Sequence, residues 1–218
     1  KVFDTKIKEK IALKLIKPEI ASDSETIERF SNEIRLARKI VHKNICRMYD
    51  LNEEGGTSYI TMEYVPGEDL KSMIRMMGKL SPSQALLIGK QVCAGLAEAH
   101  KLGIIHRDLK PGNIRIGDNG EPHILDFGLA KTPRGAEEAS LMTMTGQFMG
   151  SLPWASPEQA EADPHRVDMR TDVYSLGVTL YELVTLRRPF EAPTREGLFR
   201  QILGPEPPDP RKLNRNIP

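Results

Sequence analysis

Two strings of polar residues frame a short predicted hairpin, and their order constrains the fold more than any other feature of the chain. The first string is His106–Asn113 and the second is Asp126–Gly128. Between them, the runs Ile114–Ile116 and His123–Leu125 flank Asp118–Gly120, a strong signal for a tight turn. Aspartates and asparagines beside turns, taken singly, are turn formers. Their shared order and spacing here indicate a functional site instead.

The first 65 residues have the pattern of a small antiparallel sheet. The apolar run Ile11–Ile16 is typical of a strand. The segments Ile45–Leu51 and Thr57–Met62 lie on either side of Glu53–Gly56, which predicts a hairpin. One helix is expected between the first strand and this hairpin.

The expected helix rests on spacing and on a start signal. Apolar residues recur there at helical intervals, at Ile27, Phe30, Ile34 and Val41. Ser22 followed by Glu25 forms a capping box at the predicted start. The helix should therefore pack on the sheet.

Beyond Pro66 the pattern becomes mainly helical. Ser81 and Gln84 form a capping box for a helix that runs to about Leu102. The segment Val173–Leu186 is the most apolar of the chain, which predicts a helix buried in the middle of a lobe. Residues 131–150 have no clear period, and a loop of that length in a compact domain is usually functional or disordered.

Composition and charge exclude several classes of protein. The 218 residues carry a net charge of +1, which gives no electrostatic reason to expect nucleic acid or an anionic membrane as a partner. No apolar run approaches the roughly 20 residues that span a bilayer. Cys46 and Cys93 lie among apolar residues without CxxC spacing, which predicts two buried free thiols. A cytoplasmic location is expected.

The two polar strings carry a resemblance to a known family. The strings HRDLKPGN and DFG resemble the catalytic loop and the metal-binding turn of protein kinases. The lysine at 110 is the serine/threonine form of that loop. The resemblance covers essentially the whole chain and is nearest to bacterial relatives of the eukaryotic kinases. It implies a two-lobed α+β fold, with residues 1–65 as a sheet lobe with one helix and residues 66–218 as a mainly helical lobe.

The resemblance also assigns catalytic roles. Asp108 would orient the attacking hydroxyl, and Lys110 would contact the transferring phosphate. Asn113 and Asp126 would hold Mg²⁺ through hard oxygen ligands. The cofactors implied are ATP and Mg²⁺.

A nucleotide site is implied by residues further upstream. Lys14, in the string Ala12–Lys14, would reach the α and β phosphates, with Ala12 also at the nucleotide. Glu33 would be the ion-pair partner of Lys14, although Glu25 and Glu28 compete for that role. A lone lysine in a strand is ordinarily a solvent-facing residue.

The segment that follows the predicted hairpin resembles the kinase hinge. Met62 would be the gatekeeper, and the Glu63 carbonyl and the Val65 N–H would bond to adenine. Asp69 would reach the ribose, and Arg115 would lie on the floor of the adenine site, where an aliphatic residue is usual. A strand that ends in a proline turn would explain the same residues without any ligand.

Regulation is implied by an arginine and by threonines. Arg107 and Lys131 would bind a phosphate on the activation loop, where Thr143 and Thr145 are the candidate sites. Threonines in a polar loop are common and need no such role. Asp172 would brace the backbone of the catalytic loop from the apolar helix.

The chain departs from the family pattern in ways that leave alternatives open. It shows no glycine-rich loop, and we expect a kinase domain that is truncated at both ends. Serine or threonine residues of protein substrates are the expected targets, with tethered sensor domains or a membrane anchor outside this chain. The alternatives are a pseudokinase or inactive fragment that binds nucleotide or partners, and a related small-molecule kinase. The segment ending in Ser156–Glu158 favours protein substrates.

Overall fold

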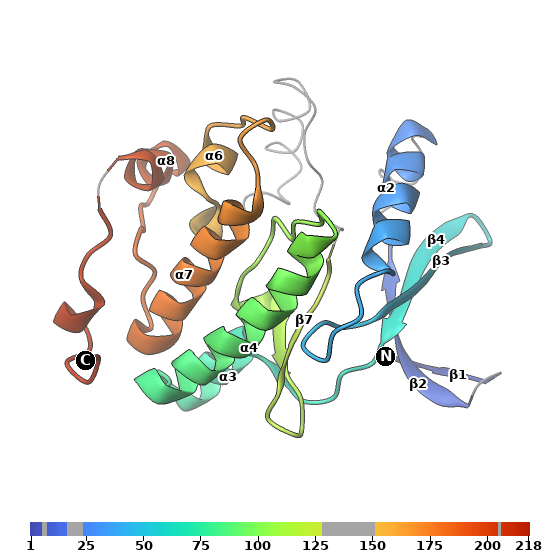
Figure 1. Ribbon diagram of the computed structural model, residues 1–218, viewed down its shortest axis with the longest axis horizontal. Helices are drawn as coiled ribbons and strands as arrows, with labels where there is room; N and C mark the ends of the chain where they lie inside the picture. Colours follow the sequence, from blue (N-terminus) through green and yellow to red (C-terminus); the bar gives the residue numbers. More distant parts are fainter. Residues whose placement is uncertain (6–7, 17–23, 128–150, 205) are drawn as a thin grey trace.

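The computed structural model describes residues 1–5, 8–16, 24–127, 151–204 and 206–218. Residues 1–65 hold four strands and one helix, and the remainder is mainly helical with three short strands (Figure 1). The predicted two-lobed α+β fold is confirmed. The boundary between residues 65 and 66 stays a prediction.

The first sheet has four antiparallel strands in the order β1-β2-β4-β3. They are β1 (Val2–Asp4), β2 (Glu9–Leu15), β3 (Met48–Glu54) and β4 (Thr57–Glu63). The β3–β4 hairpin closes through Gly55 and Gly56, which both have positive φ values of 57° and 74°. Two-residue hairpin turns of this kind favour glycine. The predicted hairpin is confirmed.

Helix α2 (Ser24–Ala37) lies beside this sheet (Figure 1). The prediction that Val41 belongs to the helix is wrong, because α2 ends before it and the Val41 side chain is 69% exposed. Ile34 and Ile40 are buried and attach the end of the helix to the core. Ser22 of the predicted capping box lies outside the described residues, so the capping box stays a prediction.

A second sheet has three short antiparallel strands in the order β5-β6-β7. They are β5 (Glu68–Asp69), β6 (Ile114–Ile116) and β7 (Pro122–Ile124). The β6–β7 hairpin confirms the turn predicted at residues 118–120. An isolated parallel bridge between Ile45 and Ile124 joins the segment after α2 to β7. Asn44 reinforces it, since its Nδ2 donates to the Pro122 carbonyl oxygen at 2.8 Å.

The helices form the other part of the molecule. They are α3 (Leu70–Met77), α4 (Pro82–Lys101), α6 (Pro157–Ala160), α7 (Met169–Thr185) and α8 (Arg195–Leu203), with short 3-10 turns at Pro111–Asn113, Leu152–Trp154 and Pro210–Lys212. The predicted capping box of Ser81 and Gln84 starts α4. Helices α4 and α7 pack closely at Gly89, where an added Cβ would lie 3.2 Å from Leu180.

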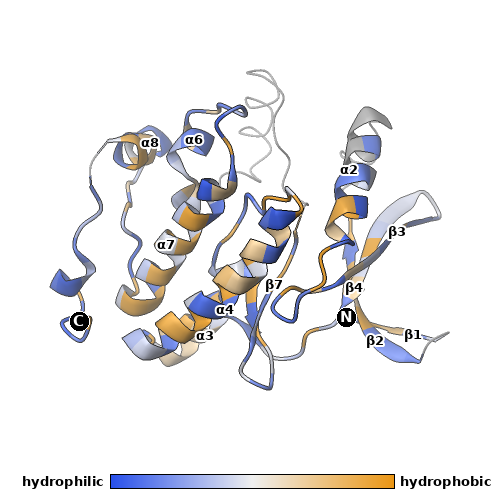
Figure 2. Cartoon of the chain, in the orientation of Figure 1, coloured by the Kyte–Doolittle hydropathy of each residue, from blue (hydrophilic) through white to orange (hydrophobic). Residues whose placement is uncertain are grey.

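The core runs from α2 and the first sheet into α4 and α7, and hydrophobic residues recur along both of these helices (Figure 2). Two burial predictions are wrong. Helix α7 is not buried on all sides, because the Val173 side chain is 62% exposed. Cys93 is exposed on α4, whereas Cys46 is buried, and burial raises the pKa of the Cys46 thiol to about 12. Neighbouring positions on a helix face different directions, so an apolar stretch of sequence does not fix burial.

Candidate active site

Asp108 lies at the centre of a small group of polar side chains. Its Oδ2 accepts hydrogen bonds from the Lys110 Nζ at 2.6 Å and from the Asn113 Nδ2 at 3.0 Å. The Lys110 Nζ also donates to the Ser151 Oγ at 2.6 Å. The three residues predicted to be catalytic are therefore joined directly, and Ser151 joins them from a distant part of the chain.

Asp126 is brought to the same place by the backbone. The Leu125 N–H donates to the Asn113 carbonyl oxygen at 2.8 Å, so the end of β7 runs beside the start of β6. Asp126 has a φ of 62°, a left-handed conformation that is uncommon outside glycine. Its Oδ2 forms an ion pair with the Lys14 Nζ at 2.7 Å. This contact connects the first sheet to the predicted metal-binding turn.

Asp172 on α7 braces the catalytic loop, as predicted. Its fully buried carboxylate accepts hydrogen bonds from the His106 and Arg107 N–H groups, both at 2.9 Å, and from the His100 Nε2 at 2.7 Å. Burial would raise the pKa of the Asp172 carboxyl, but the hydrogen bonds from His100 and from the His106 and Arg107 N–H groups together lower it. The carboxylate is thus held in its charged form.

His106 joins the two predicted strings to each other. Its side chain is fully buried, and its Nε2 lies 2.7 Å from the Leu125 carbonyl oxygen. Its ring meets that of Phe127 edge to face, with centroids 4.8 Å apart. One imidazole therefore links the catalytic loop to the turn that carries Asp126.

Lys14 and Glu33 are not brought together. Lys14 pairs with Asp126, and Glu33 lies 4.0 Å from the Arg107 guanidinium. Among the ion pairs between described residues, none joins Lys14 to Glu33. The predicted Lys14–Glu33 contact is therefore wrong for this conformation, because Arg107 and Asp126 supply the opposite charges instead.

The residues predicted to bind adenine lie along β4 and the segment after it. Ala12 is paired with Met62 across β2 and β4, and the Met62 and Val65 side chains are buried. The Glu63 carbonyl oxygen accepts a hydrogen bond from the Cys46 Sγ at 3.3 Å. A carbonyl oxygen has two lone pairs, so this contact leaves a second site for adenine.

Asp69 and Arg115 lie opposite each other on β5 and β6. The Asp69 carboxylate caps α3, since it accepts hydrogen bonds from the Ser72 N–H and Oγ, both at 2.9 Å. The Arg115 guanidinium donates to the Gly67 carbonyl oxygen. An arginine at this position therefore ties the predicted floor of the nucleotide site to the predicted hinge.

The donor set of Asn113 and Asp126 fits Mg²⁺. Because the Asn113 Nδ2 donates to Asp108, the amide oxygen is the atom left to act as a ligand. Asp126 supplies a carboxylate that is 25% exposed. In the described part of the chain there is no group of three or more His, Cys, Asp or Glu that could hold a metal. Mg²⁺ at phosphoryl-transfer sites is commonly bound by one or two protein ligands together with phosphates and water, so two residues suffice.

Only one of the residues predicted to be regulatory lies in the described part of the chain. Arg107 is described, whereas Lys131, Thr143 and Thr145 lie outside the described residues. Among the described residues, no helix combines the length and apolar character that crossing a membrane requires.

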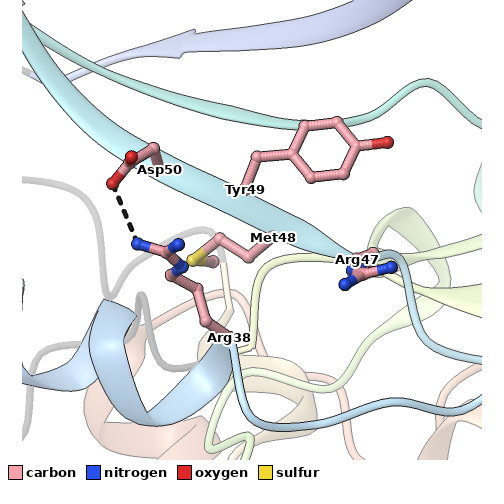
Figure 3. A pocket seen from close by; sticks show the side chains of 5 residues that line it. All are labelled: Arg38, Arg47, Met48, Tyr49 and Asp50. Carbon is pink, nitrogen blue, oxygen red and sulfur yellow. Dashed lines mark hydrogen bonds and ion pairs between the residues drawn. The ribbon is translucent and has the colours of Figure 1, made fainter.

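A pocket of about 440 Å³ lies elsewhere, where the end of α2 meets β3 (Figure 3). It is lined by Arg38, Arg47, Met48, Tyr49 and Asp50, and an Arg38–Asp50 ion pair crosses it. None of the predicted site residues lines it.

Sequence reasoning overlooked Gln159 on α6. Its Nε2 donates to the Arg107 carbonyl oxygen at 2.7 Å, which connects α6 to the catalytic loop. The capping-box spacing of Ser156 and Gln159 was a usable signal for the start of a helix. It could not have shown the contact with Arg107, which lies 52 positions away.

The fold and this site are those of a protein kinase, and the comparison with known families agrees. The model of the protein kinase domain matches residues 1–207, so the chain belongs to the protein kinase family. The resemblance to protein kinases found in the sequence is confirmed.

Similar proteins include bacterial serine/threonine-protein kinases. A Clostridium acetobutylicum protein named as a probable serine/threonine-protein kinase is 38% identical over 100% of this chain and 32% of its own length. Serine/threonine-protein kinase PknA of Mycobacterium tuberculosis is 40% identical over 98% of this chain and 50% of its own length. The chain therefore spans a third to a half of the length of these curated relatives. The crystal structure of Rad53 in complex with AMP-PNP has a TM-score of 0.70 and 27% identity, covering 90% of this chain and 46% of that one.

Proposed function

We propose that this protein transfers the γ-phosphate of ATP to serine or threonine hydroxyls of protein substrates. The observation that carries the proposal is the direct contact of Asp108 with Lys110 and Asn113, beside Asp126. Transfer of a phosphoryl group requires mainly positioning and charge stabilisation, and this group of residues supplies both. Serine or threonine is proposed as the target because the similar curated proteins are named serine/threonine-protein kinases.

The geometry supports a role for each of these residues. The substrate hydroxyl would attack the γ-phosphorus while the bond to ADP breaks, and the Asp108 carboxylate would accept the hydroxyl proton. Lys110 would stabilise the charge on the transferring phosphate, and Lys14 would bind the phosphates once it leaves Asp126. Bound Mg²⁺ would neutralise phosphate charge, with Asn113 and Asp126 as its protein ligands.

Adenine recognition and regulation complete the proposal. The Glu63 carbonyl and the Val65 N–H would bond to adenine, between Ala12 and Arg115, and Asp69 would bind the ribose. Phosphorylation of Thr143 or Thr145 would regulate the enzyme through Arg107 and Lys131. A cytoplasmic location, with further domains attached, belongs to the same proposal.

The alternative is a pseudokinase that binds nucleotide or partners without transferring phosphate. The intact set of Lys14, Asp108, Asn113 and Asp126 speaks against it. The test incubates the purified protein and an Asp108→Asn variant with MgATP and a basic protein substrate. Mass spectrometry should detect phosphate on serine or threonine with the unaltered protein alone. Equal phosphate with both proteins, or none with either, would contradict the proposal.

A further inference from the structure

The backbone at Arg107 is in an unusual conformation. Arg107 has a φ of 66°, in the left-handed region that non-glycine residues rarely adopt. Such a conformation persists when surrounding contacts hold it in place. Since the next residue is the proposed catalytic aspartate, the contacts that hold this turn also aim the Asp108 side chain.

Side chains from three parts of the chain hold the backbone of this turn. The Arg107 N–H donates to the Asp172 Oδ1 at 2.9 Å. The Asp108 N–H donates to the His106 Nδ1 at 3.2 Å. The Arg107 carbonyl oxygen accepts from the Gln159 Nε2 at 2.7 Å. His106 and Gln159 therefore hold opposite edges of the same peptide plane.

The orientation of His106 is fixed by its two contacts. Its Nδ1 accepts a hydrogen bond from the Asp108 N–H, so the ring proton is on Nε2. The Nε2–H then donates to the Leu125 carbonyl oxygen at 2.7 Å. One edge of the peptide plane is thus held by a buried ring that cannot turn over without losing both bonds.

The orientation of the Gln159 amide is fixed in the same manner. Its Oε1 accepts a hydrogen bond from the Ser156 N–H at 3.1 Å, as the capping box of α6 requires. With the oxygen committed to an N–H donor, the Nε2 faces the Arg107 carbonyl. A flipped amide would place an oxygen against that carbonyl and an NH₂ against the N–H. The capping box therefore orients the donor that holds the catalytic loop.

We propose that Gln159 is a positioning residue, which orients Asp108 by holding the carbonyl of the Arg107–Asp108 peptide. This inference rests on the proposed function for its effect on catalysis. Within the described part of the chain, Gln159 hydrogen-bonds to Ser156 and Arg107 and not to Lys14 or to the segment expected to bind adenine. Its effect should therefore fall on kcat more than on KM for ATP.

The chain offers a selective variant and a matched control. Gln159→Glu keeps an oxygen for the Ser156 N–H, because glutamate also serves in a capping box, but removes the donor to the Arg107 carbonyl. Gln84→Glu makes the same change in the capping box of α4, where the Gln84 Oε1 accepts from the Ser81 N–H at 3.0 Å. Gln84 is exposed and lies outside the active site.

The experiment measures kcat and KM for ATP, and amide hydrogen exchange at residues 106–108, for the unaltered protein and both variants. We expect Gln159→Glu to lower kcat about tenfold with KM for ATP within about twofold, as a displaced catalytic group would. Exchange at residues 106–108 should be faster in this variant only. Lowering the pH towards 5 should narrow the gap in kcat, because a protonated carboxyl regains an O–H donor. A purely structural role for Gln159 would not produce this pH dependence.

The possible outcomes separate the two proposals. If the unaltered protein transfers phosphate and Gln159→Glu matches Gln84→Glu in kcat and in exchange, the positioning role is wrong. If the unaltered protein transfers none, the proposed function fails. The amide exchange at residues 106–108 then tests the positioning role by itself. Unchanged exchange in Gln159→Glu would overturn that role.

Discussion

The two sides of the active site are held in different ways. On the catalytic-loop side, Asp172 and Gln159 bond directly to the backbone at His106 and Arg107 over 2.7 to 2.9 Å. On the sheet side, the Lys14 side chain is 47% exposed and reaches the site through its ion pair with Asp126. Glu33, on α2, lies 4.0 Å from the Arg107 guanidinium. The first side is fixed by buried and partly buried hydrogen bonds to backbone, and the second by more exposed ion pairs between side chains.

This difference shows what each side contributes. Buried hydrogen bonds to backbone are costly to break, and exposed ion pairs contribute little to stability. The catalytic loop should therefore be part of the stable core, whereas Lys14 can exchange its partner at low cost. Substitutions on the two sides should differ accordingly in the free energy of unfolding.

Asp172→Ala should lower the free energy of unfolding by about 3–5 kcal/mol, because it leaves buried donors without an acceptor. Urea unfolding followed by circular dichroism measures this change. A loss below roughly 1 kcal/mol, the size of one ordinary net hydrogen bond, would remove the distinction between the two sides.

The pH dependence of stability should carry the signature of Asp172. Its folded pKa is lowered, so its contribution is present above the ordinary value of 3.8 and is lost as the pH falls through the folded value. The difference in free energy of unfolding between the unaltered protein and Asp172→Asn should therefore be constant from pH 7 to 5. It should narrow by on the order of 1 kcal/mol at lower pH. A gap that widens in acid would contradict the prediction.

Glu182 shows that a buried carboxyl group is not always held in its charged form. It accepts one hydrogen bond, from the Trp154 Nε1 at 2.9 Å, and burial raises the pKa of its carboxyl. Its contribution is therefore greatest in acid and is lost as the pH rises through the raised value. Glu182→Gln keeps the acceptor without the charge and should increase stability at pH 7 by roughly 0.5–1 kcal/mol. Thermal unfolding at pH 7 and pH 4 tests this, since the gain should shrink at pH 4.

Lys14→Met should change the free energy of unfolding by less than about 0.5 kcal/mol, because the Lys14–Asp126 pair is exposed. Phosphate transfer should nevertheless fall at least about 100-fold, since a charge that would bind the phosphates is lost. Unfolding and transfer assays on the same preparation give both numbers. A large loss of stability would mean that the sheet side is as firmly held as the loop side.

The sequence was most informative where contacts are local. Gly55 and Gly56 predicted one hairpin, and Ser81 with Gln84 predicted the start of α4, because a turn or a cap depends on a few adjacent residues. The catalytic strings identified Asp108 and its neighbours for the same reason. The order and spacing of the residues within these strings are enough to predict the site.

The sequence failed where the outcome depends on distant residues. The exposure of Cys93 and Val173 depends on which face of a helix meets the core. The partners of Lys14 and Glu33 depend on how α2 sits against the loop side. The importance of Gln159 lies in its hydrogen bond to the Arg107 carbonyl oxygen, and no local sequence pattern predicts that contact.

The bridge between Ile45 and Ile124 has a mechanical consequence. Together with the Lys43–Glu121 ion pair at 2.7 Å and the bond from Asn44 to Pro122, it fastens residues 43–46 to the end of the molecule that holds the helices. In rigid-body terms, that short stretch is a fulcrum and the four-stranded sheet is a lever arm that begins at Met48. Any rocking of the sheet would displace its far strand β1 most and leave Cys46 almost still.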